Sequence, residues 1–469
     1  MPSQKSPSPW SRQGPPRTLP LALALALALA MALGGCSSWS PQAQGVPDPA
    51  IATTGAGTSS LAQWWQRFND PLLSTLVTQA LQANTSIRSS QAALQQSRAL
   101  RDVQGAGMLP GVSASTSAQR SKSGDLEAGN SFRVGLDASW EPDVFGGKRS
   151  ALNASEADAL AAGATLADVQ VSVAAEVALA YIQLRGQQTQ LMIARNNLKS
   201  QLETLQITDW RVQAGLTTSL ELEQARTASE QTAAQIPTLE ASIAQTQHSL
   251  AVLTGQTPLA LQAQLTPALA IPQAAEDLAV SIPAQTLRQR PDVRAAEHRI
   301  NAALARVSAA DAARYPSFSI SGSLGLSALT LGGLTSGASV ASALLGGISV
   351  PLFDGGAARA QVQAQEAGLE QARAGYQSVV LTALKDVEDA LVALAGDRAR
   401  LVHLQNAATA ADNAALLAQQ RYATGLIDFQ IVLQTQRTLL TTQDNVASTS
   451  TDISADHVRL YKALGGGWN

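Results

Sequence analysis

The amino-acid sequence repeats itself once, and this repetition limits what the chain can fold into more than any other feature. At an offset near 210 residues, the segment 178–191 aligns with 388–401, so that Gly186 meets Gly396. Residues 211–216 (RVQAGL) align with 421–426 (RYATGL) at the same offset. Solenoids repeat about every 20–45 residues, so a period this long indicates internal duplication of a whole folding unit. We therefore expect two halves built from the same elements in the same order.

Each half contains two neighbouring segments in which apolar and polar residues alternate. In the first half the alternation covers about 111–141 and is interrupted by a polar, glycine-containing stretch over 121–130. In the second half it covers about 317–352. A period of two is typical of strands with one apolar face, joined here as hairpins. Strands of about ten residues have the length at which a tilted strand crosses an outer membrane.

Long helical segments follow each hairpin. Apolar residues recur at sevenfold spacing over about 148–212 and 218–254, and again over about 356–422 and 428–463. Heptads of this length indicate coiled-coil packing between neighbouring helices. No proline occurs in residues 148–211, and a helix of that length would span ~95 Å at ~1.5 Å per residue. Pro237 lies inside the first returning helix, where it is predicted to remove one backbone hydrogen bond and bend the helix.

The composition indicates how these elements are arranged. Charged residues make up 14% of the chain and aromatic residues 4%, which leaves few bulky side chains for a conventional core. Unpaired strand edges cannot lie in hydrocarbon, and four strands are fewer than the roughly eight of the smallest barrel. We therefore predict a barrel shared between two, three or four copies, continued by a cylinder of helices with water on both sides. An ordinary coiled coil would explain the heptads but not the hairpins.

The N-terminus predicts export and lipidation. Three basic residues precede an apolar run of 13 residues, Leu21–Leu33, which has the length of a signal peptide and not the ~20 residues of a spanning helix. The run ends in Leu-Gly-Gly-Cys36, which resembles the bacterial lipobox, and Cys36 is the only cysteine, so it cannot form an internal disulfide. We predict a signal peptide over 1–35, lipidation of Cys36 and a lipidated tether over 36–60.

Several sequence blocks resemble the TolC-like outer membrane factor family, in particular its NodT-type lipoproteins that serve resistance-nodulation-division efflux pumps. The resemblance covers essentially the whole mature chain. It implies a mixed α and β membrane protein that forms a homotrimer, with four strands per chain in a shared 12-stranded outer-membrane β-barrel continued by a long periplasmic α-helical barrel. The blocks that carry it are Trp64–Pro71, Trp140–Gly146, Arg288–Glu297, Tyr315–Pro316, Pro351–Gly356 and the two Arg-x-x-x-Gly-Leu segments.

The resemblance also implies a function and a location. It predicts the outer-membrane channel of a tripartite efflux system, a passive exit duct for drugs or other small molecules. An inner-membrane resistance-nodulation-division pump would drive export through a periplasmic adaptor, the membrane fusion protein. The chain would be anchored in outer-membrane lipid, because Ser37 replaces the aspartate that retains bacterial lipoproteins at the inner membrane. A proline-rich equatorial linker over 256–291 would separate the first repeat, 61–255, from the second, 292–465.

The two Arg-x-x-x-Gly-Leu segments are the predicted adaptor-contacting tips. Each falls where a long helix must reverse into the next, so the glycines are expected to be left-handed residues that end a helix. A turn alone does not require the same arginine and leucine in both halves, and the family meets its adaptor at such turns. The predicted contact residues are Arg211, Gly215, Leu216, Arg421, Gly425 and Leu426.

The periplasmic entrance is predicted to lie next to the second tip. Family members often carry an aspartate there, as a ring that favours cations. The matching position in this chain is Gln434, which puts that ring in doubt. Asp428 lies closer to the tip and is either a partial substitute or an exposed aspartate at a helix start.

Catalytic, metal and cofactor chemistry is not predicted. The histidines are scattered, and the glycine clusters lack the context of a phosphate loop. Arg290-Pro291-Asp292 is predicted to open the helix from Val293. The mature chain carries 29 basic and 35 acidic residues, a net charge of −6, so we expect no nucleic-acid partner. Three alternatives stay open: a type I protein-secretion duct, a metal-ion efflux channel, which the scarcity of methionine disfavours, and a periplasmic coiled-coil adaptor lipoprotein without a pore.

Overall fold

The computed structural model describes residues 63–466, apart from residue 126 and residues 275–287. The chain divides into two compact units, Met1–Ala56 and Gly57–Asn469, and the whole first unit lies outside the described residues. The predicted signal peptide, Cys36 and the tether over 36–60 therefore also lie outside them. The description that follows concerns the second unit.

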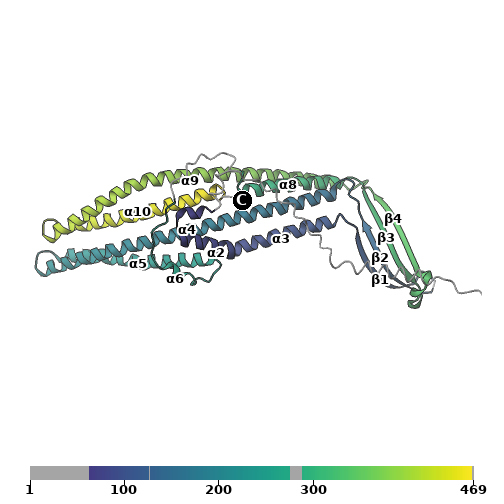
Figure 1. The fold of residues 1–469 in the computed structure, drawn as a ribbon, viewed down its shortest axis with the longest axis horizontal. Helices are drawn as coiled ribbons and strands as arrows, with labels where there is room; N and C mark the ends of the chain where they lie inside the picture. The colour runs from purple at the N-terminus through teal and green to yellow at the C-terminus, as the bar shows by residue number, and fades with distance from the viewer. Residues whose placement is uncertain (1–62, 126, 275–287, 467–469) are drawn as a thin grey trace, which may run out of the picture. The chain divides into compact units, whose positions relative to one another are not determined.

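The four predicted strands form a single antiparallel sheet in the order β1-β2-β3-β4 (Figure 1). β1 pairs with β2 and β3 pairs with β4 as hairpins, while β2 and β3 pair across the two halves of the chain with Gly135 opposite Gly325. Within the described residues, β1 and β4 each keep one unpaired edge. The strands span Gly111–Ser121 (β1), Gly129–Trp140 (β2), Ser317–Ala328 (β3) and Val340–Ser349 (β4).

The apolar face of this sheet is exposed. Val134, Leu136 and Leu324 point to the same face by strand phase and are 47%, 43% and 51% exposed. An antiparallel sheet in water buries its apolar face against a core. A sheet that exposes this face along its length fits a hydrocarbon environment instead.

Two pairs of long helices carry the repeated pattern. α4 spans Gly147–Gln213 and α5 spans Ser219–Leu253, whereas α9 spans Ala357–Ala423 and α10 spans Phe429–Ala463. Every one of these boundaries differs from its counterpart by 210 positions. The 67 residues of α4 span ~100 Å at ~1.5 Å per residue. α5 lies beside α4 and α10 lies beside α9 (Figure 1).

Pro237 lies inside α5, which runs without interruption from Ser219 to Leu253. α4 is long and apolar enough, by length and composition alone, to cross a membrane. Its apolar stretch is 44% buried inside the protein, and α4 packs against α2, α5, α8 and α10. Packing therefore explains the apolar character of α4.

Shorter helices complete the described chain. α3 packs on α4, and α8 packs on both α4 and α9. Asp70 caps α2, since its Oδ1 accepts the backbone N–H of Leu72 and Leu73 at 2.9 Å each, an arrangement that satisfies amides left free at a helix start. These helices are η1 (Trp64–Phe68), α2 (Pro71–Ala83), α3 (Thr85–Ala106), α6 (Gln262–Leu265), α8 (Pro291–Ala312), η2 (Leu331–Thr335) and η3 (Gly337–Ser339).

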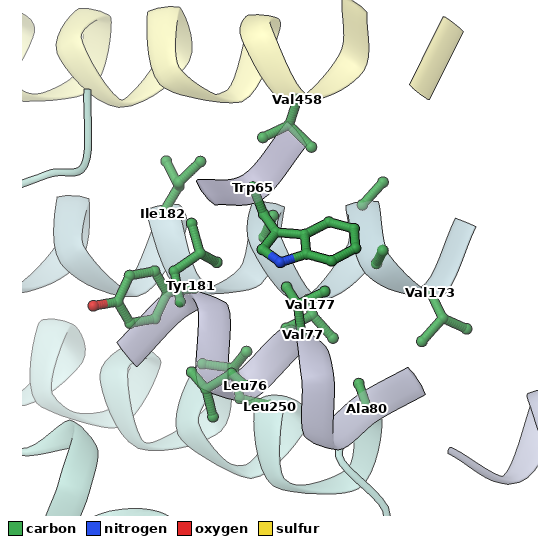
Figure 2. Packing of buried hydrophobic residues seen from close by; sticks show 14 of the residues in the cluster. Trp65, Leu76, Val77, Ala80, Val173, Val177, Tyr181, Ile182, Leu250 and Val458 are labelled. Carbon is green, nitrogen blue, oxygen red and sulfur yellow. The ribbon is translucent and has the colours of Figure 1, made fainter. Parts of the chain in front are cut away.

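The largest hydrophobic core of the described chain joins η1, α2, α4, α5 and α10 (Figure 2). Trp64 is 1% exposed and stacks on Tyr461 of α10 with ring centroids 5.4 Å apart. Val177 of α4 and Leu250 of α5 are fully buried in the same cluster. Each fully buried large apolar side chain stabilises the fold by about 1.5–3 kcal/mol, so this cluster holds η1, α2 and α10 against the middle of α4.

A buried arginine attaches the mid-chain linker to this core. Arg185 of α4 is 0% exposed and donates hydrogen bonds to the carbonyl oxygen of Pro267 and to Gln188 Oε1, both at 2.7 Å. It also donates to the hydroxyl of Tyr181, which donates to Asp70 Oδ2 at 2.7 Å. Burial is the main cause that raises the pKa of Tyr181 to about 12. The guanidinium of Arg185 is thus linked to the carboxylate of Asp70 through the neutral hydroxyl of Tyr181.

Beyond residue 195 of α4, the heptad leucines are not the most buried residues. Leu198 and Leu205 are half-buried, whereas a polar seam facing the other helix pair is almost completely buried. Its members are Asn197, Gln201, Thr204 and Thr208, which are 6%, 5%, 2% and 0% exposed. Asn197 Nδ2 donates to Gln443 Oε1 at 3.0 Å, and Gln436 Nε2 donates to Thr204 Oγ1 at 2.8 Å. The two helix pairs therefore meet through hydrogen bonds between polar side chains.

Candidate functional site

The turns after α4 and α9 have the same backbone geometry. Gly215 and Gly425 have φ values of +70° and +81°, a conformation that residues other than glycine rarely adopt. The amide of Leu216 donates to the carbonyl of Arg211 at 2.8 Å, and the amide of Leu426 donates to the carbonyl of Arg421 at 2.9 Å. These are the bonds of a Schellman motif, in which the leucine is the second residue beyond the helix cap.

Both leucines are exposed although this motif usually buries them. The second residue beyond the cap frequently packs against the last turn of its own helix. Leu216 and Leu426 instead remain 69% and 74% exposed. Each turn therefore presents an apolar side chain that the described chain does not cover.

The two predicted arginines have different environments. Arg211 donates from Nη1 to the backbone carbonyl of Tyr422, and its guanidinium lies 4.5 Å above the centre of the Tyr422 ring. Arg421 is exposed, and its side chain makes no hydrogen bond within the described residues. The sequence repeat predicted the same role for both residues. The structure makes the half-buried Arg211 a link between the helix pairs and leaves Arg421 exposed at the surface.

Tyr422 is the centre of this link. It is 2% exposed, and its hydroxyl lies 3.2 Å from both Thr208 Oγ1 and Glu221 Oε2. The Tyr422 hydroxyl donates to Glu221, and either hydroxyl can donate in the contact between Tyr422 and Thr208. Burial raises the pKa of Tyr422 above its ordinary value of 10, so the hydroxyl is neutral at physiological pH.

A small hydrophobic cluster surrounds Tyr422 and closes the tip region. The ring of Phe429 lies 5.6 Å from that of Tyr422. The other buried members are Ala225, Ala228, Ala418, Val432 and Leu433. Sequence reasoning missed this cluster and Glu221. The available signal was Tyr422 itself, which stands where the first repeat has Val212 inside otherwise matching segments.

Asp428 and Gln434 do not come together. Asp428 is exposed at the N-cap position of α10, but its side chain caps no backbone amide. Gln434 is exposed on α10 six residues later. Six residues at ~100° each place two side chains on different faces of a helix. The two side chains therefore lie apart, and a partial substitution of the missing carboxylate ring by Asp428 stays a prediction.

Arg290 has a packing role. It lies at the N-cap of α8, which begins at Pro291, and it pairs with Asp292 at 2.8 Å. Its Nη1 donates to the carbonyl of Ala463 at 2.8 Å and so attaches the start of α8 to the end of α10. Among the described residues, no group of three or more His, Cys, Asp or Glu side chains is arranged to hold a metal ion.

The sequence is similar to known outer-membrane proteins along most of its length. Residues 76–256 and 282–466 match the family described as Outer membrane efflux protein. The toluene efflux pump outer membrane protein TtgF of Pseudomonas putida is 32% identical over 460 residues, which cover 93% of this chain and 95% of TtgF. Nodulation protein T of Rhizobium leguminosarum is 30% identical over 423 residues, which cover 89% of this chain and 86% of that protein.

The fold is also similar to that of a solved channel. The structure of the outer-membrane channel OprN superposes with a TM-score of 0.83 at 35% sequence identity, covering 87% of this chain and 93% of OprN. This chain thus combines sequence similarity to outer-membrane efflux proteins with two long helix pairs and a sheet whose apolar face is exposed. The protein belongs to the outer membrane efflux protein family and is the outer-membrane channel component of a tripartite efflux system, not an enzyme.

Proposed function

We propose that three copies of this chain close a 12-stranded β-barrel in the outer membrane, which continues as a helical barrel in the periplasm. The sheet ends in two unpaired edges, on β1 and β4. In hydrocarbon each edge needs a partner, and β4 of one copy pairing with β1 of the next satisfies every edge. Four strands alone are too few for a barrel. The number three follows from the resemblance to TolC-like channels.

The proposed organisation of the chain rests on the repeat. The common offset of 210 residues between all boundaries of the long helices supports a duplicated unit over 61–255 and 292–465. The same family matches both halves, which also supports duplication. The linker over 256–291 joins them at the equator. We further propose that residues 1–35 are removed and that lipidated Cys36 and residues 36–60 form a tether to the outer membrane.

The tips of the helix pairs are the proposed docking site for the periplasmic adaptor. The observation that carries this proposal is the exposure of Leu216 and Leu426 at positions where a Schellman motif usually buries an apolar side chain. Gly215 has no neighbouring atom within 4 Å of a built Cβ, so a partner backbone can approach closely there. Arg421 supplies an exposed positive charge beside Leu426.

Arg211 has a different proposed role from the other tip residues. Its guanidinium is held by the carbonyl and the ring of Tyr422. We assign it to holding the two helix pairs in register, so that both leucines are presented together. Of the six predicted contact residues, five therefore face the adaptor and Arg211 positions them.

The docking proposal is tested by replacing Leu216 and Leu426 together by Asp. Efflux of a fluorescent dye and photo-crosslinking to the adaptor should both be lost in cells. Trimers in native mass spectrometry and pore conductance in planar bilayers should stay at wild-type values, because both leucines lie outside the packed clusters. Leu220→Asp is the matched control, since Leu220 is 65% exposed in the first turn of α5 but lies outside the motif.

Three results would refute the docking proposal. In the first the double variant exports dye at the wild-type rate, and in the second loss of trimers fully accounts for its loss of export. An equal loss of crosslinking in Leu220→Asp would show that any added charge near the tips disrupts docking, so that the motif has no specific role.

The proposed cargo is drugs or other small molecules, and the exit duct is passive. TtgF, one of the relatives, is named for toluene efflux, which supports small apolar compounds as the first class to test. Deleting the gene and measuring sensitivity to solvents, dyes, drugs and metal ions separates this proposal from metal export. Comparing the secreted proteins of the same two strains tests the protein-secretion alternative.

A further inference from the structure

The two hairpin turns of the sheet differ in chemistry. All four open strand ends connect to helices, so both turns lie at the opposite ends of the strands. The turn between β1 and β2 contains Lys122, Asp125 and Glu127. The turn between β3 and β4, which we name the apolar turn segment and define as residues 329–339 (LTLGGLTSGAS), contains no charged residue.

The apolar turn segment folds onto the apolar face of the sheet. Gly333 lies so close to the last residue of β3 that a built Cβ would be 3.2 Å from the Cβ of Ala328. Ala328 pairs with Phe132, which shares a strand face with Val134 and Leu136. The segment therefore continues the apolar band beyond the ends of the strands and does not turn toward the polar face.

Side-chain hydroxyls satisfy several backbone carbonyls of the segment internally. Thr335 Oγ1 donates to the carbonyl of Gly332 at 3.1 Å, and Ser336 Oγ donates to that of Gly333 at 2.8 Å. Ser339 Oγ lies 2.8 Å from the carbonyl of Leu334 and 2.7 Å from that of Ser336. Such bonds also form at water-exposed positions, as at Thr409 and Thr438 of the long helices. In hydrocarbon each unsatisfied group costs several kcal/mol.

The segment exposes two leucines. Leu329 and Leu331 are 75% and 68% exposed, and Val340 at the start of β4 is 59% exposed. These apolar side chains occur on or directly after a turn without charge, beside a sheet face of the same character. Water is an unfavourable environment for such a surface.

We propose that the apolar turn segment inserts among the acyl chains of the outer leaflet and extends the lipid-facing surface of the barrel on the β3–β4 side only. This inference rests on the proposed barrel, since it takes the apolar sheet face to be the lipid face. The polar β1–β2 turn stays in water at the same end. The rim of the barrel therefore carries two kinds of turn. In every copy the β3–β4 turn lies in lipid and the β1–β2 turn lies in water.

The test uses spin labels on the full-length protein in phospholipid vesicles. Three single variants are labelled: Leu331→Cys in the apolar turn segment, Ser123→Cys in the polar turn as the matched control, and Leu324→Cys in the middle of β3. The wild-type chain is carried through the same labelling to measure any signal from Cys36. Collision rates with oxygen, which enters lipid, and with a water-soluble nickel chelate are then compared.

The label at residue 331 should show a severalfold higher ratio of oxygen to nickel collisions than the label at 123, and a ratio close to that at 324. An aqueous ratio at 331 with a lipid ratio at 324 overturns the inference and leaves the barrel proposal intact. An aqueous ratio at 324 refutes the orientation of the sheet and the inference with it. Spin–spin broadening between copies at 331 would place the three segments together over the pore mouth, which also overturns it.

Discussion

Gly186 and Gly396 occupy matching positions of the repeat but have opposite surroundings, so the same substitution should have opposite effects. A Cβ at Gly186 of α4 would lie 2.4 Å from Oγ1 and 2.9 Å from Cγ2 of Thr451 on α10. A Cβ at Gly396 of α9 would meet no atom within 4 Å. The first glycine permits a close helix–helix contact, whereas the second has no such neighbour in the described chain.

At each position the helix-propensity gain and the overpacking cost together decide whether alanine raises or lowers the free energy of unfolding. Replacing a glycine inside a helix by alanine stabilises by about 0.8–1.0 kcal/mol, which should be fully gained in Gly396→Ala. Overpacking costs about 1–3 kcal/mol, and Thr451 cannot move its hydroxyl freely because it donates to the carbonyl of Ala447 at 2.8 Å. Gly186→Ala should therefore destabilise by about 0–2 kcal/mol, since overpacking exceeds the helix gain.

A second substitution should reverse this sign. Thr451→Ala removes both Oγ1 and Cγ2 and leaves only a Cβ at 3.2 Å from the built Cβ of residue 186. In that background Gly186→Ala should become stabilising by up to about 1 kcal/mol, as it recovers the helix preference. The pair is therefore strongly non-additive, as expected for residues in direct contact.

The assay is thermal unfolding in detergent, followed by circular dichroism at one fixed scan rate because the unfolding of large membrane proteins is often irreversible. The expected order of Tm is Gly396→Ala above wild type and wild type above Gly186→Ala. The double variant should unfold above Thr451→Ala alone. The reasoning is refuted if Gly186→Ala raises Tm as much as Gly396→Ala, or if the two substitutions at 186 and 451 are additive.

Three further outcomes are expected. Cys36→Ala should lower assembly or yield more than pore conductance, because the acyl chains supplement a barrel with its own apolar band; mass spectrometry that finds Cys36 unmodified in the mature protein would contradict lipidation. Block of the pore by trivalent cations should be weaker than in carboxylate-bearing relatives and should strengthen in Gln434→Asp. Equal block of the wild-type and the Gln434→Asp channels would exclude a role for this position. Burial raises the pKa of Asp444 above the ordinary 3.8, so the folded state holds a proton that the unfolded chain has released, and stability falls as pH rises through that window. Asp444→Asn should therefore raise Tm at neutral pH and lose this gain below the ordinary pKa, and a gain that is independent of pH would show that charge is not the cause.

Local periodicity was enough to predict the four strands and the four long helices of this fold, but not α2 or α3. Alternation with period two predicted strands over about 111–141 and 317–352, and the structure has β1 to β4 within those limits. Heptads predicted a helix over about 148–212, and α4 spans 147–213. These patterns can be read from sequence because each depends on which face of one element meets an apolar environment. Positive φ at Gly215 and Gly425 follows from the same local chemistry.

Contacts between the two halves were decided only by tertiary structure. The repeat predicts the same role for Arg211 and Arg421, yet only Arg211 contacts Tyr422. The sequence repeat does not reveal such differences, because equivalent elements contact different neighbours once the chain folds.

The packing of α4 shows the same limit of local patterns. The heptad predicts one apolar face of α4, but the most buried residues beyond position 195 are polar, including Thr204 and Thr208. Their burial depends on hydrogen-bond partners that lie more than 200 positions away in the sequence, such as Tyr422 and Gln436. Periodicity describes one helix at a time, whereas the stability of a buried polar group depends on a specific partner in space.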